Sequence, residues 1–183
     1  MGDWFSSFLS LFFPRCCLVC GGPLAKGEEC LCTRCNIGLP RTGYHRIKNN
    51  LVEQLFLGKI PLERATAYFF YQRGSDFCHI IHQLKYGGQK EIGEAMGRYM
   101  AAELLSSGFF EGVDVIVPVP LHKKKQKLRG YNQSEWIARG ISAITSIPVE
   151  TSGVVREKNT ETQTRKLSLI HISEPTRHLR ISY

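Results

Sequence analysis

The chain has 183 residues, of which 43% are hydrophobic, and its formal net charge is +8 at pH 7. This length and apolar content predict one globular domain with a buried core, together with a small additional module. The positive charge favours anionic partners such as nucleic acid, phosphorylated metabolites or acidic surfaces, without choosing among them. No apolar run approaches the roughly 20 residues that a membrane-spanning helix needs, so we expect no membrane span.

The first feature along the chain is the apolar segment Trp4 to Phe13. It has no basic leader and no small-residue cleavage site, so it is interpreted as an amphipathic helix rather than a signal peptide. The missing secretory signal and the isolated Cys78 both indicate a reducing compartment. We therefore expect a cytoplasmic protein.

Six of the seven cysteines lie between Cys16 and Cys35. Two C-x-x-C pairs in this region can bring four thiolates around one tetrahedral zinc ion. A disulfide framework is the alternative, and the reducing compartment disfavours it. A site closed by four thiolates is structural rather than catalytic, because no position is open for substrate. The predicted ligands are Cys17, Cys20, Cys32 and Cys35; Cys16 and Cys30 are spare and could replace a neighbour.

The segment after the cysteines is expected to connect two modules. Gly38 to Asn50 is basic and rich in turn residues, and the boundary is placed near Pro40. Aromatic and β-branched residues in Glu63 to Gln72 predict a strand. A helix is expected to follow with Ser75 as its N-cap and Gly87 at its end.

The second half of the chain alternates helices with strands. A helix is predicted over Lys90 to Ser107, where Gly93 and Gly97 would form a packing face. Strand Val113 to Val117 follows, then a basic loop, the helix Asn132 to Ile144 and an edge strand over Ile147 to Glu157. This alternation predicts an α/β fold with a parallel sheet, whose ligands bind at the carboxyl ends of strands.

The basic loop lies at such an end, between a strand and the start of a helix. Its arginine, its glycine and the unpaired N–H groups of the helix start favour binding of an anionic phosphate group. For the lysines Lys123, Lys124, Lys125 and Lys127, a solvated loop without a ligand is an equal alternative. Only two aromatic residues, Tyr131 and Trp136, are near this loop in sequence, so no stacking platform is evident. His79 and His82 are interpreted as ordinary polar-face residues.

Several motifs occur in one order along the chain: the four-cysteine ribbon, LKYGG (Leu84 to Gly88), PVPLHKKKQKLRGYNQSE (Pro118 to Glu135) and VVREKNTETQTRK (Val154 to Lys166). Together they resemble the ComF family, the ComFC-type competence proteins, over about Leu11 to Lys166. The resemblance implies a zinc ribbon fused to a type I phosphoribosyltransferase domain and a link to DNA uptake in naturally competent bacteria.

The resemblance also implies particular site residues. The ligand would be phosphoribosyl pyrophosphate with Mg, in a transferase of the glycosyltransferase class that acts in nucleoside metabolism; no catalytic acid or base is assigned. The pyrophosphate loop would be Arg129, Gly130, Tyr131, Asn132 and Gln133. The flexible loop that covers the site would include Arg156, Thr160, Thr162, Gln163, Thr164 and Arg165.

The sequence departs from this family after the flexible loop. The strand that ends in two acidic residues and leads into a Thr/Gly-rich phosphate loop is absent, and the last segment, 167–183, is similar to a translated sequencing-library adapter. We therefore expect residues 1–40 to form an N-terminal helix and zinc ribbon. Residues 41–166 would form an incomplete, C-terminally truncated phosphoribosyltransferase-like domain without enzyme activity, and residues 167–183 would not be native sequence.

An alternative function is a nucleic-acid-binding or protein-docking adaptor of the DNA-uptake machinery without catalysis. Its partners would be single-stranded DNA and a helicase-like competence protein. Binding to nucleic acid would weaken steeply with salt, whereas a diphosphate in a pocket would be less sensitive. The acceptor substrate and the oligomeric state stay open.

Overall fold

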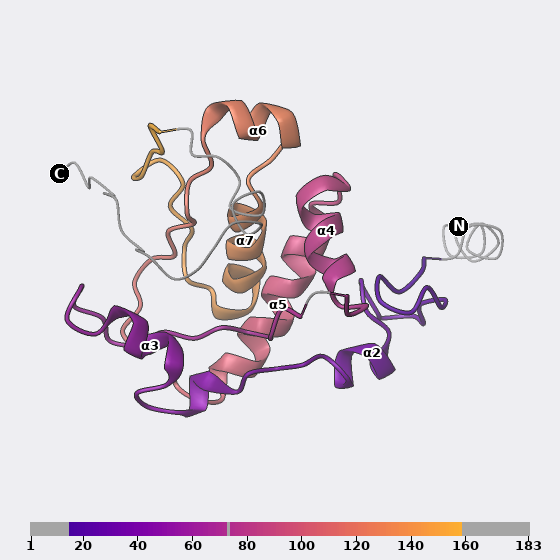
Figure 1. Ribbon diagram of the computed structural model, residues 1–183, viewed down its shortest axis with the longest axis horizontal. Coiled ribbons are helices and arrows are strands. Elements are labelled where there is room, and N and C mark those ends of the chain that lie inside the picture. Colours follow the sequence, from indigo (N-terminus) through magenta and orange to yellow (C-terminus); the bar gives the residue numbers. More distant parts are fainter. Residues whose placement is uncertain (1–14, 73, 159–183) are drawn as a thin grey trace.

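The computed structural model describes residues 15–72 and 74–158 (Figure 1). These residues are mostly helical, and the only bridges between extended segments in them are isolated ones. The predicted helix at Trp4 to Phe13 lies outside the described residues. The helices are α2 (Thr33–Ile37), the 3₁₀ helix η1 (Tyr44–Arg46), α3 (Leu51–Phe56), α4 (Cys78–Tyr86), α5 (Glu91–Leu105), α6 (Lys123–Arg129) and α7 (Gln133–Thr145).

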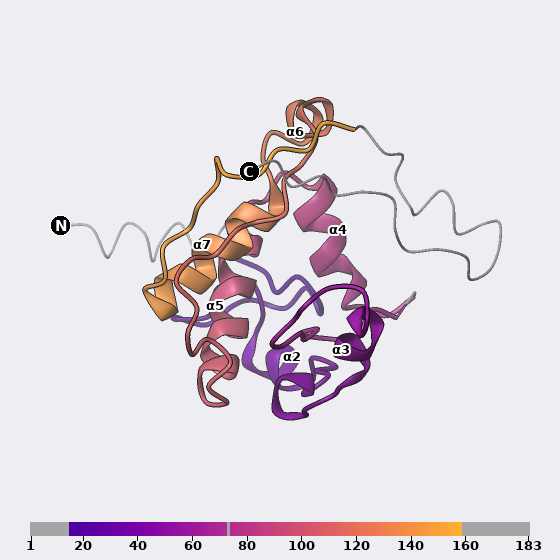
Figure 2. The same cartoon turned by 90° about the vertical axis from the view of Figure 1, so that its left-hand side faces the viewer.

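Helices α5 and α7 pack against each other at the centre of the molecule (Figures 1 and 2). Both were expected, and each begins and ends within two residues of its predicted bounds. A Cβ atom added to Gly97 would lie 2.2 Å from the carbonyl oxygen of Ile137, and one added to Gly140 would lie 2.1 Å from that of Glu94. The predicted glycine packing face is therefore confirmed, because any side chain here would force the helices apart.

Helix α4 ends where it was expected and begins later than predicted. Gly87 is its C-cap, and the buried Ile80 and Leu84 face the core. The predicted N-cap, Ser75, is wrong, since the capping position is taken by Phe77 without any side-chain cap. The Ser75 carbonyl instead accepts a hydrogen bond from Cys78 N at 3.0 Å, so the residue opens a turn before the helix.

The parallel sheet expected from the sequence is not present in residues 15–72 and 74–158. The predicted strands over 113–117 and 147–157 meet at one parallel bridge between Ile116 and Val149. Two hydrogen bonds hold it: Ile116 N donates to Pro148 O at 2.9 Å, and Glu150 N donates to Ile116 O at 3.0 Å. The segment 63–72 is also not a strand, and it pairs only through an antiparallel bridge between Phe69 and Arg41.

The valines in and just after the expected strand Val113 to Val117 are only partly buried. Alternate residues Val113, Val115, Val117 and Val119 are 39%, 44%, 46% and 65% exposed. Their face is thus only partly covered by the described residues. Parallel pairing is weaker per residue than antiparallel pairing, and a pair of strands without a covered face or a third strand is marginal. The segment therefore has the composition of a strand, but it forms no sheet within the described residues.

The cysteine region and the helices share one hydrophobic core. Buried Cys17, Leu31 and Leu39 belong to the same cluster as Ile80 and Ile92, which come from α4 and α5. The chain on either side of Pro40 is therefore in contact, and a division into two domains there stays a prediction. None of the helices in the described ranges is long and apolar enough to cross a membrane.

Candidate functional site

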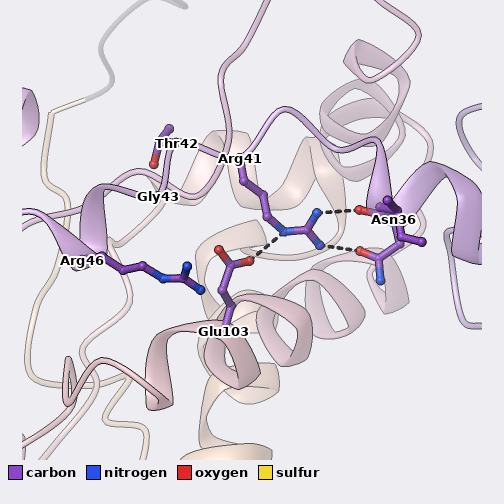
Figure 3. Close-up of a pocket in the computed structure, with 7 residues that line it drawn as sticks. Asn36, Arg41, Thr42, Gly43, Arg46 and Glu103 are labelled. Carbon is purple, nitrogen blue, oxygen red and sulfur yellow. Dashed lines mark hydrogen bonds and ion pairs between the residues drawn. The ribbon is translucent and has the colours of Figure 1, made fainter.

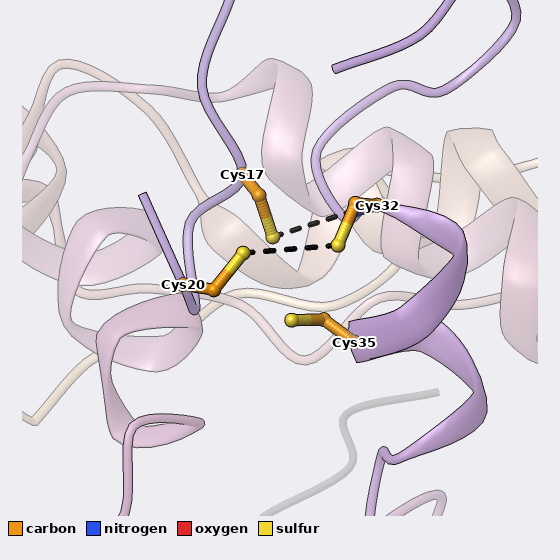
Figure 4. Close-up of side chains that lie close together, drawn as sticks. All are labelled: Cys17, Cys20, Cys32 and Cys35. Carbon is orange, nitrogen blue, oxygen red and sulfur yellow. Dashed lines mark hydrogen bonds between the residues drawn. The ribbon is translucent and has the colours of Figure 1, made fainter. Parts of the chain in front are cut away.

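Four cysteine side chains converge at the edge of the shared core (Figure 4). Their sulfur atoms all lie within 4.8 Å of one another, and the Sγ atoms of Cys20 and Cys32 are 3.8 Å apart. Tetrahedral zinc with Zn–S bonds of about 2.3 Å needs sulfur atoms about 3.8 Å apart. The four residues are those predicted from the C-x-x-C spacing, namely Cys17, Cys20, Cys32 and Cys35, and they are positioned to hold a metal ion.

Backbone turns bring the two cysteine pairs together. The first pair sits on a tight turn in which Gly21 N donates to Cys17 O at 2.9 Å. The second pair is presented by α2, which begins after Cys32 and carries Cys35 on its buried side. The turns are joined where Leu18 N donates to Cys30 O at 3.0 Å. Each pair therefore has a rigid backbone that aims both sulfur atoms at one point.

The first cysteine of the cluster is poised to ionise. Burial acts to raise the pKa of Cys17, but hydrogen bonds from backbone N–H groups of Cys20, Cys32 and Val19 outweigh it and lower the pKa to about 6. One of these donors, Cys32 N, lies 3.3 Å from the sulfur. Cys35 behaves in the opposite way, because burial and the neighbouring thiols raise its pKa. A cation at the centre would favour the thiolate form of every member.

The two spare cysteines lie outside the cluster. Cys30 is buried in the core, where burial, helped by the charge of Glu29, raises the pKa of its thiol to about 12. Cys16 is exposed. The four-cysteine group is the one potential metal site found within residues 15–72 and 74–158, so neither spare residue replaces a ligand in this arrangement. His79 and His82 likewise belong to no such group there.

The predicted basic loop is wrong in its form, because the lysines lie on helix α6. His122 caps this helix by accepting a hydrogen bond from Lys124 N at 3.2 Å. Long unbranched side chains favour a helix, and Gly130, with φ of 81°, ends it in the left-handed conformation that glycine adopts without strain. Lys123, Lys124 and Lys127 are exposed.

The structure brings the five predicted pyrophosphate-loop residues to the turn between α6 and α7. Asn132 caps α7 by accepting from Ser134 N at 3.1 Å, and its amide donates to Val119 O at the same distance. The Tyr131 hydroxyl donates to Leu84 O at 2.6 Å and so ties the turn to the end of α4. Arg129 Nη1 donates to Gln133 Oε1 at 2.8 Å.

Gln133 has an unsatisfied donor in this turn. The residue is 9% exposed, and its Nε2 atom is buried with no hydrogen-bond partner among the described residues. Leaving such a donor unpaired costs about 1–3 kcal/mol. The donor lies in the first turn of α7, where the helix dipole also favours negative charge. An anionic oxygen could satisfy both.

The flexible-loop prediction can be placed only in part. Arg156 lies in a segment without regular secondary structure that follows the bridge at Val149. Thr160, Thr162, Gln163, Thr164 and Arg165 lie outside the described residues, as does the segment 167–183.

A separate cavity of about 530 Å³ lies between the cysteine region and α5 (Figure 3). Arg41 spans it: Nε donates to Glu103 at 2.7 Å, and the terminal nitrogens donate to the carbonyl and side chain of Asn36. Because these bonds use all three nitrogens of the Arg41 guanidinium, its role is to hold the end of α2 on α5. Sequence reasoning missed this pair, since nothing in the sequence links positions that are 62 residues apart.

The described residues thus form a mostly helical protein with four cysteines positioned to hold a metal ion and a short basic helix, α6, ahead of α7. Comparison with known proteins found relatives named for DNA utilization. The chain is 28% identical over 168 residues to the DNA utilization protein YhgH of Escherichia coli K12, with 84% of this chain and 71% of the relative covered. The proteins of the same name from Shigella flexneri and Salmonella typhimurium are each 27% identical over the same shares.

Two further comparisons found nothing similar. No protein-family model matches the sequence. No solved structure matches the fold.

Proposed function

We propose that this protein acts in the handling of DNA and binds a diphosphate group, that of phosphoribosyl pyrophosphate, at the start of α7. The names of the relatives support the first part. The unpaired Nε2 of Gln133, next to the guanidinium of Arg129, is the observation that carries the second. A diphosphate oxygen would supply the acceptor that this donor lacks, and the resemblance to ComF proteins implies a pyrophosphate loop at the same residues.

The charges around the turn suit such a ligand. Arg129 offers a planar fork that matches phosphate oxygens, and Lys123, Lys124 and Lys127 lie on the preceding helix. The backbone N–H groups at the start of α7 add partial positive charge. Magnesium would accompany the diphosphate and neutralise part of its charge. The segment from Arg156 onward would cover the ligand.

The metal of the cysteine cluster is proposed to be zinc. Four thiolates in a tetrahedral arrangement select zinc over magnesium or calcium, which prefer oxygen. All four positions are filled by protein, so the ion would stabilise the fold and take no part in chemistry. The shared core explains how it would act on the whole structure, because Cys17 and Cys35 pack with residues of α4 and α5.

The division of the chain is also a proposal. Residues 1–40 would form the ribbon region, 41–166 a phosphoribosyltransferase-like domain that lacks its phosphate-loop strand, and 167–183 a translated adapter. Sequencing the gene beyond the codon for Lys166, without transposon adapters, tests this division. We expect an apolar strand with two acidic residues in place of 167–183, and recovery of the present codons would contradict it. These 183 residues should show no phosphoribosyl transfer, and turnover with any nucleophile would refute that expectation.

The diphosphate site is tested by calorimetric titration of the purified chain with pyrophosphate and magnesium. We expect saturable binding that Arg129→Ala and Gln133→Leu each weaken about tenfold or more, since each removes one donor to a charged ligand. Lys59→Ala is the control, because it removes one exposed cation at the end of α3, far along the chain from α7. Equal affinity in all four proteins, or no binding at all, would refute the diphosphate site.

A second candidate function is a non-catalytic adaptor that binds nucleic acid. Three lysines exposed on one short helix, α6, favour it, because such a helix can lie along a phosphate backbone. Single-stranded DNA and a helicase-like competence protein would then be the partners. The salt dependence separates the two functions: affinity for an oligonucleotide should fall steeply between low and moderate salt, and affinity for pyrophosphate less so.

A further inference from the structure

The fold creates an aromatic surface that is not visible in the sequence. Tyr86 ends α4 and Arg129 ends α6, and the two side chains meet with the guanidinium carbon 5.5 Å from the ring centre. The His82 ring lies 5.1 Å from the Tyr86 ring, one helical turn before it. Tyr86 is nevertheless 57% exposed. The structure therefore places one exposed aromatic ring beside the end of the basic helix α6, a neighbour that the sequence did not indicate.

This arrangement is rigid at its base. The hydroxyl of Tyr131 donates to Leu84 O, which fixes the α6–α7 turn against the last turn of α4. Leu84 itself is buried, so the end of α4 is anchored in the core. The exposed ring of Tyr86 is thus presented on a fixed backbone, and little conformational entropy would be lost when a flat ligand stacks on it.

A second pairing of cations with an aromatic ring lies beside the first. The Trp136 ring has Lys90 Nζ 4.7 Å and the Arg139 guanidinium carbon 4.8 Å from its centre. Trp136 lies close to helix α4, because a Cβ on Gly93 would lie 3.0 Å from Trp136 and 3.1 Å from Leu84. Lys90 and Arg139 are both exposed. Exposed positive charge therefore lies on the α5–α7 side of α4 as well as on α6.

The chemistry of this surface indicates the class of ligand that it would bind. Exposed aromatic rings that alternate with cations bind unpaired nucleobases by stacking while the cations contact phosphates. A strand of nucleic acid gains affinity from several such exposed contacts at once.

We propose that His82, Tyr86 and Arg129 form a stacking site for a base of single-stranded nucleic acid, with Lys90 and Arg139 contacting the adjoining phosphates. The inference rests on the second candidate function, and Arg129 is the one residue that it shares with the proposed diphosphate site. Tyr86 would supply the ring, and Arg129 would lie either between ring and base or against the neighbouring phosphate. Because every base has a flat face, the site would show little sequence preference.

Fluorescence anisotropy with a labelled oligothymidylate of about 12 nucleotides tests the site. Tyr86→Ala should weaken binding by about 5- to 100-fold, the range expected for the loss of one stacked base. Tyr86→Phe keeps the ring and should bind within about twofold of the parent. Tyr71→Ala, at another exposed tyrosine, should also leave affinity unchanged.

An abasic oligomer of the same length separates stacking from charge. Its affinity should be the same for the parent and for Tyr86→Ala, since only phosphates are left to bind. If Tyr86→Ala binds oligothymidylate as well as the parent, the stacking site is refuted while the adaptor function stands. If the parent binds no oligonucleotide, both fail. Tight binding of free thymidine monophosphate that Tyr86→Ala abolishes would also overturn the proposal in favour of a nucleotide site.

Titration of Tyr86→Ala with pyrophosphate distinguishes a failure of the stacking site from a failure of the diphosphate site. The variant should bind pyrophosphate like the parent, whereas Gln133→Leu should lose pyrophosphate and keep the oligonucleotide. Far-ultraviolet circular dichroism during thermal unfolding shows whether Tyr86→Ala is folded. A misfolded Tyr86→Ala would be replaced by Tyr86→Leu, which keeps apolar volume and lacks the aromatic ring, with the same expected loss.

Discussion

Gly97 on α5 and Gly140 on α7 face each other, and a Cβ built on Gly97 would lie 3.0 Å from the Gly140 Cα atom. This contact sets the distance between the two central helices. It also places the start of α7, where the diphosphate site is proposed, relative to the core that α5 shares with the cysteine cluster.

Gly97→Ala should therefore destabilise the protein. The added methyl group would meet backbone atoms of Ile137, which cannot rotate away, and overpacking of this kind costs about 1–3 kcal/mol. Urea unfolding followed by circular dichroism measures the loss. Gly153→Ala is the control, because its methyl group would lie 3.6 Å from the nearest atom, an ordinary contact. Equal midpoints for the two variants would contradict the close approach of the helices.

Removal of the metal should unfold more than the cysteine region. Cys35→Ser should reduce bound zinc from one equivalent to little or none, because the fourth ligand of a closed site is lost. Removing the metal from the parent protein with a chelator should lower the temperature at which α4 and α5 unfold with the rest of the chain, since Cys17 and Cys35 belong to their core. Metal analysis and circular dichroism measure the two effects. Cys16→Ser, outside the cluster, should retain the metal; full occupancy in Cys35→Ser would exclude the assigned ligand set.

The ion pair between Arg41 and Glu103 should contribute to stability more than the pair between Arg98 and Glu29. The side chains of the first pair are 27% and 18% exposed, and those of the second 29% and 37%. Glu103→Gln should cost about 1.5–3 kcal/mol, the range for hydrogen bonds to charged groups, and Glu29→Gln about 0–1 kcal/mol. Denaturant unfolding of both variants gives the comparison. The reverse order would show that Arg41 does not hold α2 on α5.

The protein should become less stable as the pH is lowered, because of His45. The side chain is 2% exposed, and burial lowers its pKa below 6.5, against the opposing charge of Glu103. Since the unfolded state binds the proton more tightly, stability is fully present above about pH 6.5 and is lost as pH falls towards the folded pKa. His45→Gln should flatten this dependence in urea titrations between pH 7.5 and 5. His82→Gln, at an exposed histidine, should retain it, and an unchanged slope in His45→Gln would count against the buried histidine as its source.

Local spacing predicted the parts of the structure that local contacts form. The two C-x-x-C pairs, the glycine face of α5 and the end of α4 at Gly87 all depend on residues within one or two turns of each other. Helix α3 was missed although its signal was present, because Asn50 and Glu53 form a capping box. The sequence therefore carries a local signal for α3 as well.

Features that depend on distant partners could not be predicted in the same way. The segment 113–117 has the composition of a buried strand, but a ladder requires neighbours, and the described chain provides one bridge. The stack of Tyr86 with Arg129 and the pair of Arg41 with Glu103 each join segments that only the packing of α4, α5 and α7 brings together. The lack of an acceptor for Gln133 Nε2 can be recognised only when the positions of all neighbouring acceptors are known.

The diphosphate site is tested most directly at the Gln133 side chain. Its amide signal can be followed by nitrogen–proton nuclear magnetic resonance during titration with pyrophosphate and magnesium, and assigned by its absence in Gln133→Leu. The proposed function predicts a saturable shift of this signal, because Nε2 gains an acceptor, and the same titration of Arg129→Ala should require more ligand. An amide signal that does not move while the ligand binds elsewhere, or that moves equally with chloride, would contradict the site at the start of α7.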